Sequence, residues 1–152
     1  MILCLGTGVA RAQMTNGLKE GYRGFVDIGY SNCYDESAFT ASTTHGWQLN
    51  RFVFLGGGAG VNTSGLFPVY TDVKVTFLDR RWTPFVETRA GVGICDHTGG
   101  YLSTVAGARL RLKGRYALNL MAGYERLDEG GTMFQDDVST DAGFVARLGI
   151  EF

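Results

Sequence analysis

Apolar side chains alternate with polar or small ones along most of this chain, and this period of two limits the folds that it can adopt. In the last ten residues, Phe144, Leu148, Ile150 and Phe152 share one face of an extended segment, and Arg147 lies on the other. No window sustains a helical spacing, and no run approaches the roughly 18 apolar residues of a transmembrane helix. The pattern predicts an all-β fold.

Eight segments of the chain read as strands, and each has about ten or more residues. That length is unusual for a soluble sheet and typical of a tilted strand that crosses a bilayer. The predicted strands are 22–32, 38–49, 52–62, 67–77, 82–95, 101–112, 116–127 and 141–152.

The connections between these strands alternate in length. Tight turns, "NR", "LDRR" and "KGR", alternate with longer loops, "CYDES", "TSGL", "DHTGG" and "DEGGTMFQDDVST". With an even number of strands, the tight turns and both chain ends fall on one side and the longer loops on the other. The sequence therefore predicts an eight-stranded antiparallel up-and-down transmembrane β-barrel.

The size of the barrel decides which face of each strand points inward. One face is bulky and apolar, as at Val26 and Ile28, whereas the other carries charges and glycines, as at Arg89, Gly91 and Gly93. An eight-stranded interior is only wide enough to be filled by side chains, and glycines leave room for long ones, so we place the charges inside.

These inward charges are nearly balanced, and a paired network of them would fill the lumen as a plug, with a narrow or gated pore as the alternative. The predicted network comprises Asp27, Asp72, Lys74, Glu87, Arg89, Arg109, Arg111, Glu125, Arg147 and Glu151, together with Arg23.

Aromatic residues gather at both ends of the strands, as amphipathic rings do at the two interfaces of a bilayer. Near the tight turns lie Tyr22, Trp47, Phe52, Phe77, Trp82, Tyr116 and Phe152. Near the longer loops lie Tyr30, Phe39, Phe67, Tyr70, Tyr101 and Tyr124.

Residues 22–152 resemble a small outer-membrane β-barrel, similar to the eight-stranded barrel of outer membrane protein A and the porin-like proteins of Gram-negative bacteria. The resemblance is carried by the terminal strand, with alternating Phe144, Leu148, Ile150 and a final Phe152. In that family this signal is read by the barrel-assembly machinery, so the resemblance implies that machinery and outer-membrane lipid as partners, and the bacterial outer membrane as the location.

The first residues differ in character from the rest. An apolar start ends in Ala10-Arg11-Ala12, a small-x-small pattern like that of a signal-peptidase site. We interpret residues 1–12 as the remnant of a longer signal peptide, 13–21 as a short N-terminal segment and 22–152 as the barrel domain.

Two features of the sequence could indicate a functional site, a glycine run and a histidine. The run "FLGGGAG" at 54–60 lacks the Gly-Lys-Ser/Thr of a phosphate loop, so we assign its glycines to a closely packed barrel strand. His45 falls on the lipid-facing side of its strand, where a lipid-modifying enzyme could use it with a serine and an acid. No serine or carboxylate accompanies it there, so a bulge or a tolerated polar residue is the favoured interpretation.

Cys33 and Cys95 lie at the outer ends of strands, and an oxidising compartment permits a disulfide between them. The two strands lie on opposite sides of an eight-stranded ring, whereas a disulfide needs Cα atoms within about 7 Å, so only loops folded across the mouth could join them. A metal site with Asp35 and His97 is a further alternative. The acidic last loop, with Asp128, Glu129, Asp136 and Asp137, reads first as a solvated loop. As the longest outer loop it is also the best place to expect contact with a partner, a surface or divalent cations.

The sequence predicts a non-enzymatic envelope component without a cofactor, catalytic site or resident metal. The net charge of −1 gives no reason to expect a nucleic-acid partner. Two alternatives stay open: a soluble secreted ligand-binding barrel of lipocalin or streptavidin type, and an outer-membrane lipid-modifying enzyme.

Overall fold

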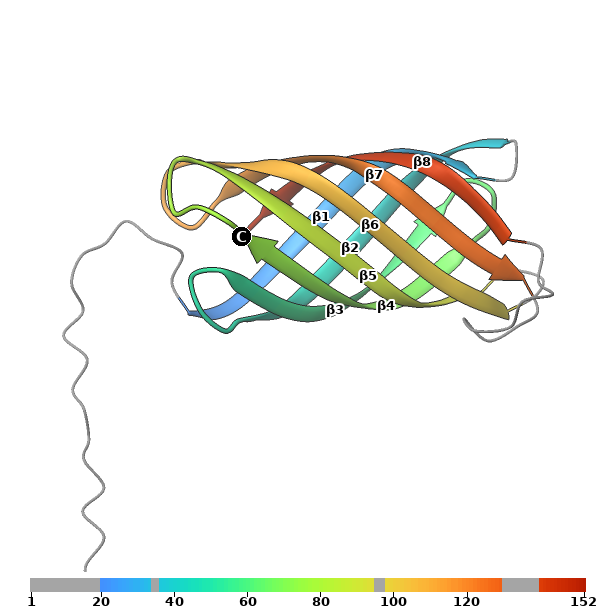
Figure 1. The fold of residues 1–152 in the computed structure, drawn as a ribbon, viewed down its shortest axis with the longest axis horizontal. Coiled ribbons are helices and arrows are strands. Elements are labelled where there is room, and N and C mark those ends of the chain that lie inside the picture. The colour runs from blue at the N-terminus through green and yellow to red at the C-terminus, as the bar shows by residue number, and fades with distance from the viewer. Residues whose placement is uncertain (1–19, 34–35, 95–97, 130–139) are drawn as a thin grey trace, which may run out of the picture.

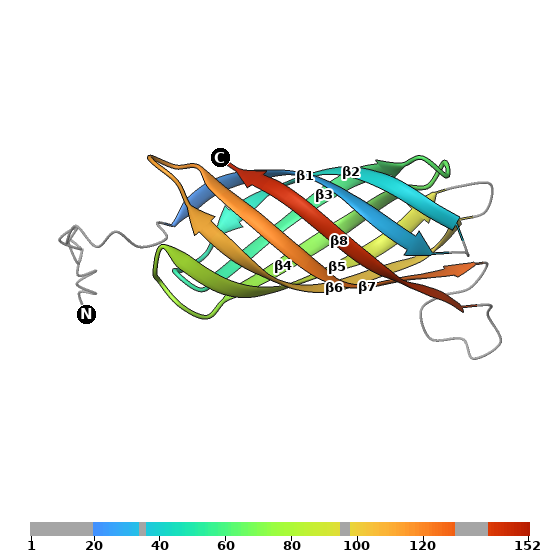
Figure 2. The same ribbon diagram turned by 90° about the horizontal axis from the view of Figure 1, so that it is seen from above.

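A computed structural model describes residues 20–33, 36–94, 98–129 and 140–152, which form a closed barrel of eight strands (Figures 1 and 2). Each strand pairs in antiparallel fashion with the next, and the last pairs with the first. The strands are β1 (Gly21–Cys33), β2 (Glu36–Gln48), β3 (Val53–Asn62), β4 (Phe67–Thr76), β5 (Trp82–Ile94), β6 (Thr98–Arg111), β7 (Ala117–Glu129) and β8 (Thr140–Glu151). The predicted eight-stranded antiparallel up-and-down barrel is confirmed.

The observed strand bounds follow the predicted ones closely except in the hairpin of β6 and β7. There β6 begins at Thr98 and β7 continues to Glu129, with Gly99 opposite Glu129 and Gly100 opposite Asp128. The polar composition suggests a loop, but backbone pairing does not depend on side-chain polarity and extends the hairpin. Asp128 and Glu129 therefore belong to a strand and not to the last loop.

The tight turns between β2 and β3, β4 and β5, and β6 and β7 lie at the same end of the barrel as the C-terminus (Figure 1). At the first of them, the Asn50 side-chain oxygen accepts hydrogen bonds from the Phe52 and Val53 amides at 2.8 and 3.0 Å. At the last, Gly114 adopts a φ of 74°, which favours glycine. We refer to this end as the turn end and to the opposite one as the loop end.

Two backbone hydrogen bonds close the barrel at its last residue. The amides of Gly24 and Phe152 each donate to the other's carbonyl at 3.0 Å. The Phe152 ring lies over Gly24, because a Cβ added there would come within 2.6 Å of the ring carbons. Glycine at position 24 thus leaves the space that the final aromatic side chain occupies.

The two faces of the barrel wall follow the predicted division, with charges inside and bulky apolar side chains outside. The interior also contains apolar groups, including a buried cluster of Phe85, Val105, Met121 and Val145. No helix that could span a membrane occurs in the described ranges.

The sequence interpretation is wrong for two residues of the expected aromatic band at the loop end, which lie inside the barrel. Tyr70 and Tyr101 are only 4% and 2% exposed, and they pack with Leu66 and Leu127 inside the barrel. Their positions within β4 and β6 place them on the inward side of the pleat, which height along the strand alone does not reveal.

Candidate functional site

Arg89 joins four strands at the centre of the barrel interior. Its guanidinium reaches from β5 across to β1, where Nη2 lies 2.5 Å from Asp27 Oδ2. It also forms ion pairs with Glu87 at 2.8 Å and with Asp72 of β4 at 3.5 Å, and it donates from Nη1 to Ser42 Oγ of β2 at 3.0 Å. Because Arg89 is 1% exposed, these partners replace the water that would otherwise solvate its charge.

Lys74 lies between a carboxylate and two aromatic rings. Its Nζ is 3.6 Å from Glu87 Oε2, and it lies 4.4 Å from the ring centre of Phe25 and 4.0 Å from that of Phe85. The faces of aromatic rings carry negative partial charge, so they supplement the single carboxylate. The sequence interpretation missed these interior rings, although Phe25 and Phe85 share the side of their strands with Asp27 and Glu87.

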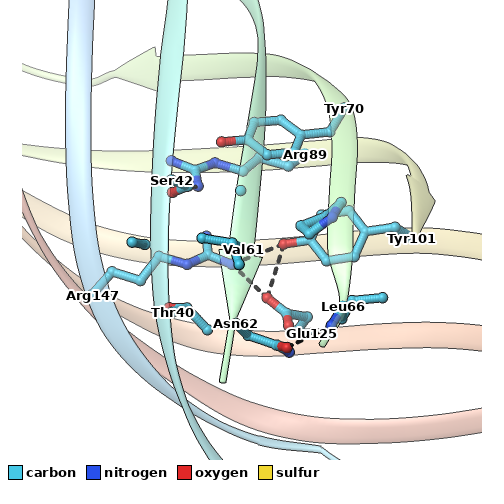
Figure 3. A pocket seen from close by; sticks show the side chains of 13 residues that line it. Thr40, Ser42, Val61, Asn62, Leu66, Tyr70, Arg89, Tyr101, Glu125 and Arg147 are labelled. Atoms are coloured by element: carbon cyan, nitrogen blue, oxygen red, sulfur yellow. Dashed lines mark hydrogen bonds and ion pairs between the residues drawn. The ribbon is translucent and has the colours of Figure 1, made fainter. Parts of the chain in front are cut away.

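Arg147 organises the half of the interior toward the loop end. Its Nη2 donates to Glu125 Oε2 at 2.6 Å, to Ser103 Oγ at 2.9 Å and to the Tyr101 hydroxyl at 3.1 Å. The Tyr101 hydroxyl donates in turn to Glu125 Oε2 at 2.9 Å, so these residues of β6, β7 and β8 form a closed set of hydrogen bonds (Figure 3).

Glu151 organises the interior near the turn end. Arg109 binds its two carboxylate oxygens with two hydrogen bonds, from Nε at 2.7 Å and from Nη2 at 2.8 Å. Arg23 contacts the same carboxylate from β1. This paired geometry adds directional hydrogen bonds to charge attraction and links β8 to β6 and β1.

Arg111 was expected to join this interior network, but it pairs with a residue of a turn instead. It is the last residue of β6, and its Nη2 pairs with Asp79 Oδ1 of the β4–β5 turn at 2.8 Å, where both side chains are partly exposed. Its place in the pleat of β6 is inward, but its side chain turns to Asp79 in the adjacent turn. The nine other predicted residues and Arg23 are brought together as five carboxylates and five cations, so these ten ionisable side chains have no formal net charge.

A small cavity lies beside Arg147 and Glu125 near the loop end. Tyr70, Tyr101 and Asn62 line it together with these charged groups (Figure 3). Val61 and Leu66 line it as well, and it has room for only about one or two water molecules. A barrel that binds a drug-sized ligand needs a cavity of roughly 300 Å³ or more.

The inward glycines lie where neighbouring groups approach the backbone. A Cβ on Gly149 would come within 1.9 Å of Asp27 Oδ1, so glycine permits Asp27 to reach Arg89. In the glycine run, a Cβ on Gly56 would meet the Phe54 ring at 2.7 Å, and one on Gly58 would meet the Tyr70 hydroxyl at 2.9 Å. The run belongs to β3, as its assignment to a packed barrel strand predicts.

His45 points outward near the turn end, and both of its ring nitrogens are hydrogen-bonded. Thr43 Oγ1 donates to the Phe25 carbonyl at 3.2 Å, so it accepts from His45 Nε2 at 2.9 Å. The Tyr22 hydroxyl then donates to Nδ1 at 2.5 Å. A neutral imidazole with its proton on Nε2 satisfies all of these bonds. No carboxylate contacts the ring within the described residues, and Phe152 packs edge-on against it with centroids 6.3 Å apart.

The remaining predictions fall largely outside the described part of the chain. Cys95, Asp35, His97, Asp136 and Asp137 lie beyond it, as does residue segment 1–19 with the predicted signal peptide. The disulfide between Cys33 and Cys95 stays a prediction. Among the residues that the structure does describe, no group of three or more His, Cys, Asp or Glu side chains is arranged to hold a metal ion.

No protein-family model and no curated protein sequence matches this chain. Solved structures do resemble it. A de novo designed transmembrane β-barrel superposes with a TM-score of 0.61 at 17% identity, covering 90% of this chain and 98% of the designed one. Neisserial surface protein A gives 0.57 at 12% identity, with coverage of 86% and 94%. The designed protein TMB2.3 gives 0.50 at 15% identity, with coverage of 91% and 97%. At these identities the likeness establishes the shared barrel fold.

We expect Arg89→Met to lower the free energy of unfolding by about 3–5 kcal/mol, because Asp27, Asp72 and Glu87 lose their shared cation inside the barrel. Adding Asp27→Asn should recover part of that loss, since one unpaired charge is then removed. Urea titration of the refolded barrel, followed by tryptophan fluorescence, measures both effects.

The matched control is Arg126→Gln, which removes an arginine whose side chain is 46% exposed and paired with Asp128. This change should cost less than about 1 kcal/mol. Equal losses for Arg89→Met and Arg126→Gln would show that the interior pairing around Arg89 does not stabilise the fold.

Proposed function

We propose that this chain is an integral β-barrel of the bacterial outer membrane that serves as a non-enzymatic envelope component, with its lumen filled by its own side chains. The observation that carries the proposal is the inverted polarity of the wall. Ten ionisable groups are gathered inside, while the outside of the eight strands is apolar.

The outward positions are the even-numbered residues of β1 and β5 to β8 and the odd-numbered residues of β2 to β4. Within the described strands, the only Asp, Glu, Lys or Arg residues at these positions are Arg126 and Asp128, an ion pair near the loop end of β7. Water-soluble proteins place charges on their surface, so a wall of this size without them supports contact with lipid.

Polar side chains on the outside of the described strands are few, and several of them have hydrogen-bond partners. His45 is bonded to Tyr22 and Thr43, and Thr88 and Thr104 lie 3.4 Å apart, oxygen to oxygen. Exposed aromatic rings at the turn end, among them Trp47 and Trp82 at 58% and 62%, form a band at the height where a bilayer interface would lie. Both features support the membrane proposal over a soluble secreted barrel.

The interior supports a plug. The ion pairs around Arg89, Arg147 and Glu151 are all buried inside the barrel, and each joins side chains from different strands. A lipid-modifying enzyme would need an acid and a nucleophile beside His45, and its observed partners, Tyr22 and Thr43, hold the ring in place instead.

Replacing an outward residue at mid-height tests membrane insertion. Ile28 is 60% exposed in the middle of β1, so Ile28→Arg should weaken folding into lipid vesicles by about 2–4 kcal/mol. Ser64→Arg in the β3–β4 connection adds the same charge outside the wall and should change little. Folded yield in vesicles, read as the heat-modifiable gel band, reports both.

In a soluble barrel the outcome would be the reverse, because an arginine on a hydrated surface costs almost nothing. Equal folding of Ile28→Arg and the unmodified chain, with the protein recovered free of lipid, would overturn the proposal.

We further propose that the final strand is the signal for the barrel-assembly machinery, carried by Phe144, Leu148, Ile150 and Phe152. All four side chains point outward and are exposed, so a partner could contact them before β8 pairs with β1. Phe152 also closes the barrel wall through its two backbone hydrogen bonds to Gly24. The same residue would thus serve both as part of the assembly signal and as the closing contact between β8 and β1.

Deleting Phe152 should lower the amount of barrel assembled in cells at least tenfold, while slowing unassisted folding into short-chain lipid vesicles only slightly. The reason is that the deletion removes two backbone hydrogen bonds and one ring from an otherwise intact wall. Phe152→Tyr keeps the aromatic ring and serves as the control, with near-normal assembly expected. A deletion that assembles normally, or that fails equally in cells and in vesicles, would contradict a signalling role.

A further inference from the structure

Exposed cations are concentrated at the turn end of the barrel. Each of the three tight turns contributes at least one, and together they form what we name the basic rim: Arg51, Arg80, Arg81, Lys113 and Arg115. All five are exposed.

Within the part of the chain that the structure describes, no acidic side chain forms an ion pair with the basic rim. Arg51 lies 5.5 Å from the centre of the Phe52 ring, and Arg115 donates to the Tyr22 carbonyl at 3.2 Å, but within the described residues no carboxylate pairs with any rim cation. Asp79, in the same turn as Arg80, is already bound by Arg111. Exposed Glu20 is the remaining acidic side chain described near this end.

The opposite end has the opposite charge. The four connections at the loop end, residues 34–35, 63–66, 95–97 and 130–139, contain four aspartates and no lysine or arginine. A barrel with this distribution carries a charge difference from end to end, although its total charge is only −1. The interior cations are paired with carboxylates, so unpaired cations at one rim point to an anion outside the protein.

The position of the basic rim along the barrel axis indicates which kind of anion it would bind. Trp47, Phe52, Phe77, Trp82 and Tyr116 are exposed at the neighbouring strand ends, where rings lie at a bilayer interface. The rim cations lie in the turns that connect these strand ends, beyond the rings and away from the apolar band. In a membrane this is the level of lipid phosphates. The geometry points to a binding surface for anionic phospholipid headgroups in the leaflet that the turn end contacts.

This inference rests on the proposed membrane location, and lipid quenching of a single tryptophan tests the two separately. Trp47→Phe leaves Trp82, which is beside Arg81, as the only tryptophan of the chain. The protein is folded into phosphatidylcholine vesicles that contain equal fractions of either dibrominated phosphatidylcholine or dibrominated phosphatidylglycerol. Bromines quench the indole only when the lipid lies against the barrel.

At about 0.05 M salt we expect the anionic lipid to be favoured about fivefold or more, the factor that one good cation contact supplies. The preference should fall toward unity at about 0.5 M salt, where charge is screened over a few ångströms. The variant with Arg80, Arg81, Lys113 and Arg115 all changed to glutamine should lose it. Arg126→Gln, which removes one cation at the loop end, should keep it.

Equal quenching by the two lipids at low salt, or a preference retained in the rim variant, would overturn the inference while leaving membrane insertion intact. Absence of quenching by both lipids would overturn the membrane proposal as well. If the fourfold variant folds poorly, two other measurements test the inference. One is Arg81→Gln alone, since Arg81 is next to the probe, and the other is the salt dependence of the unmodified protein. A lipid preference that neither the substitution nor salt diminishes would contradict a charge-based site.

Discussion

The interior of this barrel must be both filled and electrically balanced, and the ion pair between Arg89 and Asp27 is the interaction that best meets both demands. It spans the lumen from β5 to β1, which are opposite in the ring, and it is surrounded by Asp72 and Glu87. Burying so many charges is costly unless each one has partners, so the positions of the glycines, the aromatic rings and the neighbouring carboxylates all follow from this demand. Gly149 makes the point directly, because any side chain there would displace Asp27.

The architecture was predictable because two simple constraints agree. Period-two alternation identifies strands and their two faces, and the narrow lumen of an eight-stranded barrel decides which face is inside. These constraints suffice to place Arg89, Glu125 and Arg147 in the interior without any knowledge of strand register. They also identify the tight-turn end, because the loop lengths alternate.

The partners within the lumen were not predictable in the same way. Which cation meets which carboxylate depends on the stagger between strands and on how far each long side chain reaches, as when Arg109 crosses to Glu151. Arg111 shows the limit of the argument from alternation, because facing inward does not place a side chain within the lumen if its strand has ended. Tyr70 and Tyr101 show the converse, since their height suggested an interfacial band while the pleat turned them inside.

The two ends of the barrel differ in composition, and the seam between β8 and β1 closes at one of them. Phe152 closes β8 against β1 beside Tyr22 and His45, and the same end carries the exposed aromatic residues and the basic rim. One end of the barrel thus combines chain closure, exposed aromatic rings and positive charge, whereas the connections at the other end are longer and contain acidic residues. This asymmetry gives the barrel a direction that the symmetric strand pattern alone does not have.

We propose that the apolar wall faces lipid while the charges lie inside. The most direct test is a depth profile along β8, with nitroxide labels at its successive outward positions, residues 142, 144, 146, 148 and 150, after the native cysteines are replaced by serine. In vesicles, collision with oxygen should be greatest and collision with a water-soluble nickel complex least at position 146, with the trend reversing toward both ends of the strand. High nickel accessibility along the whole series would mean that the outer wall faces water, and would rule out a barrel embedded in lipid.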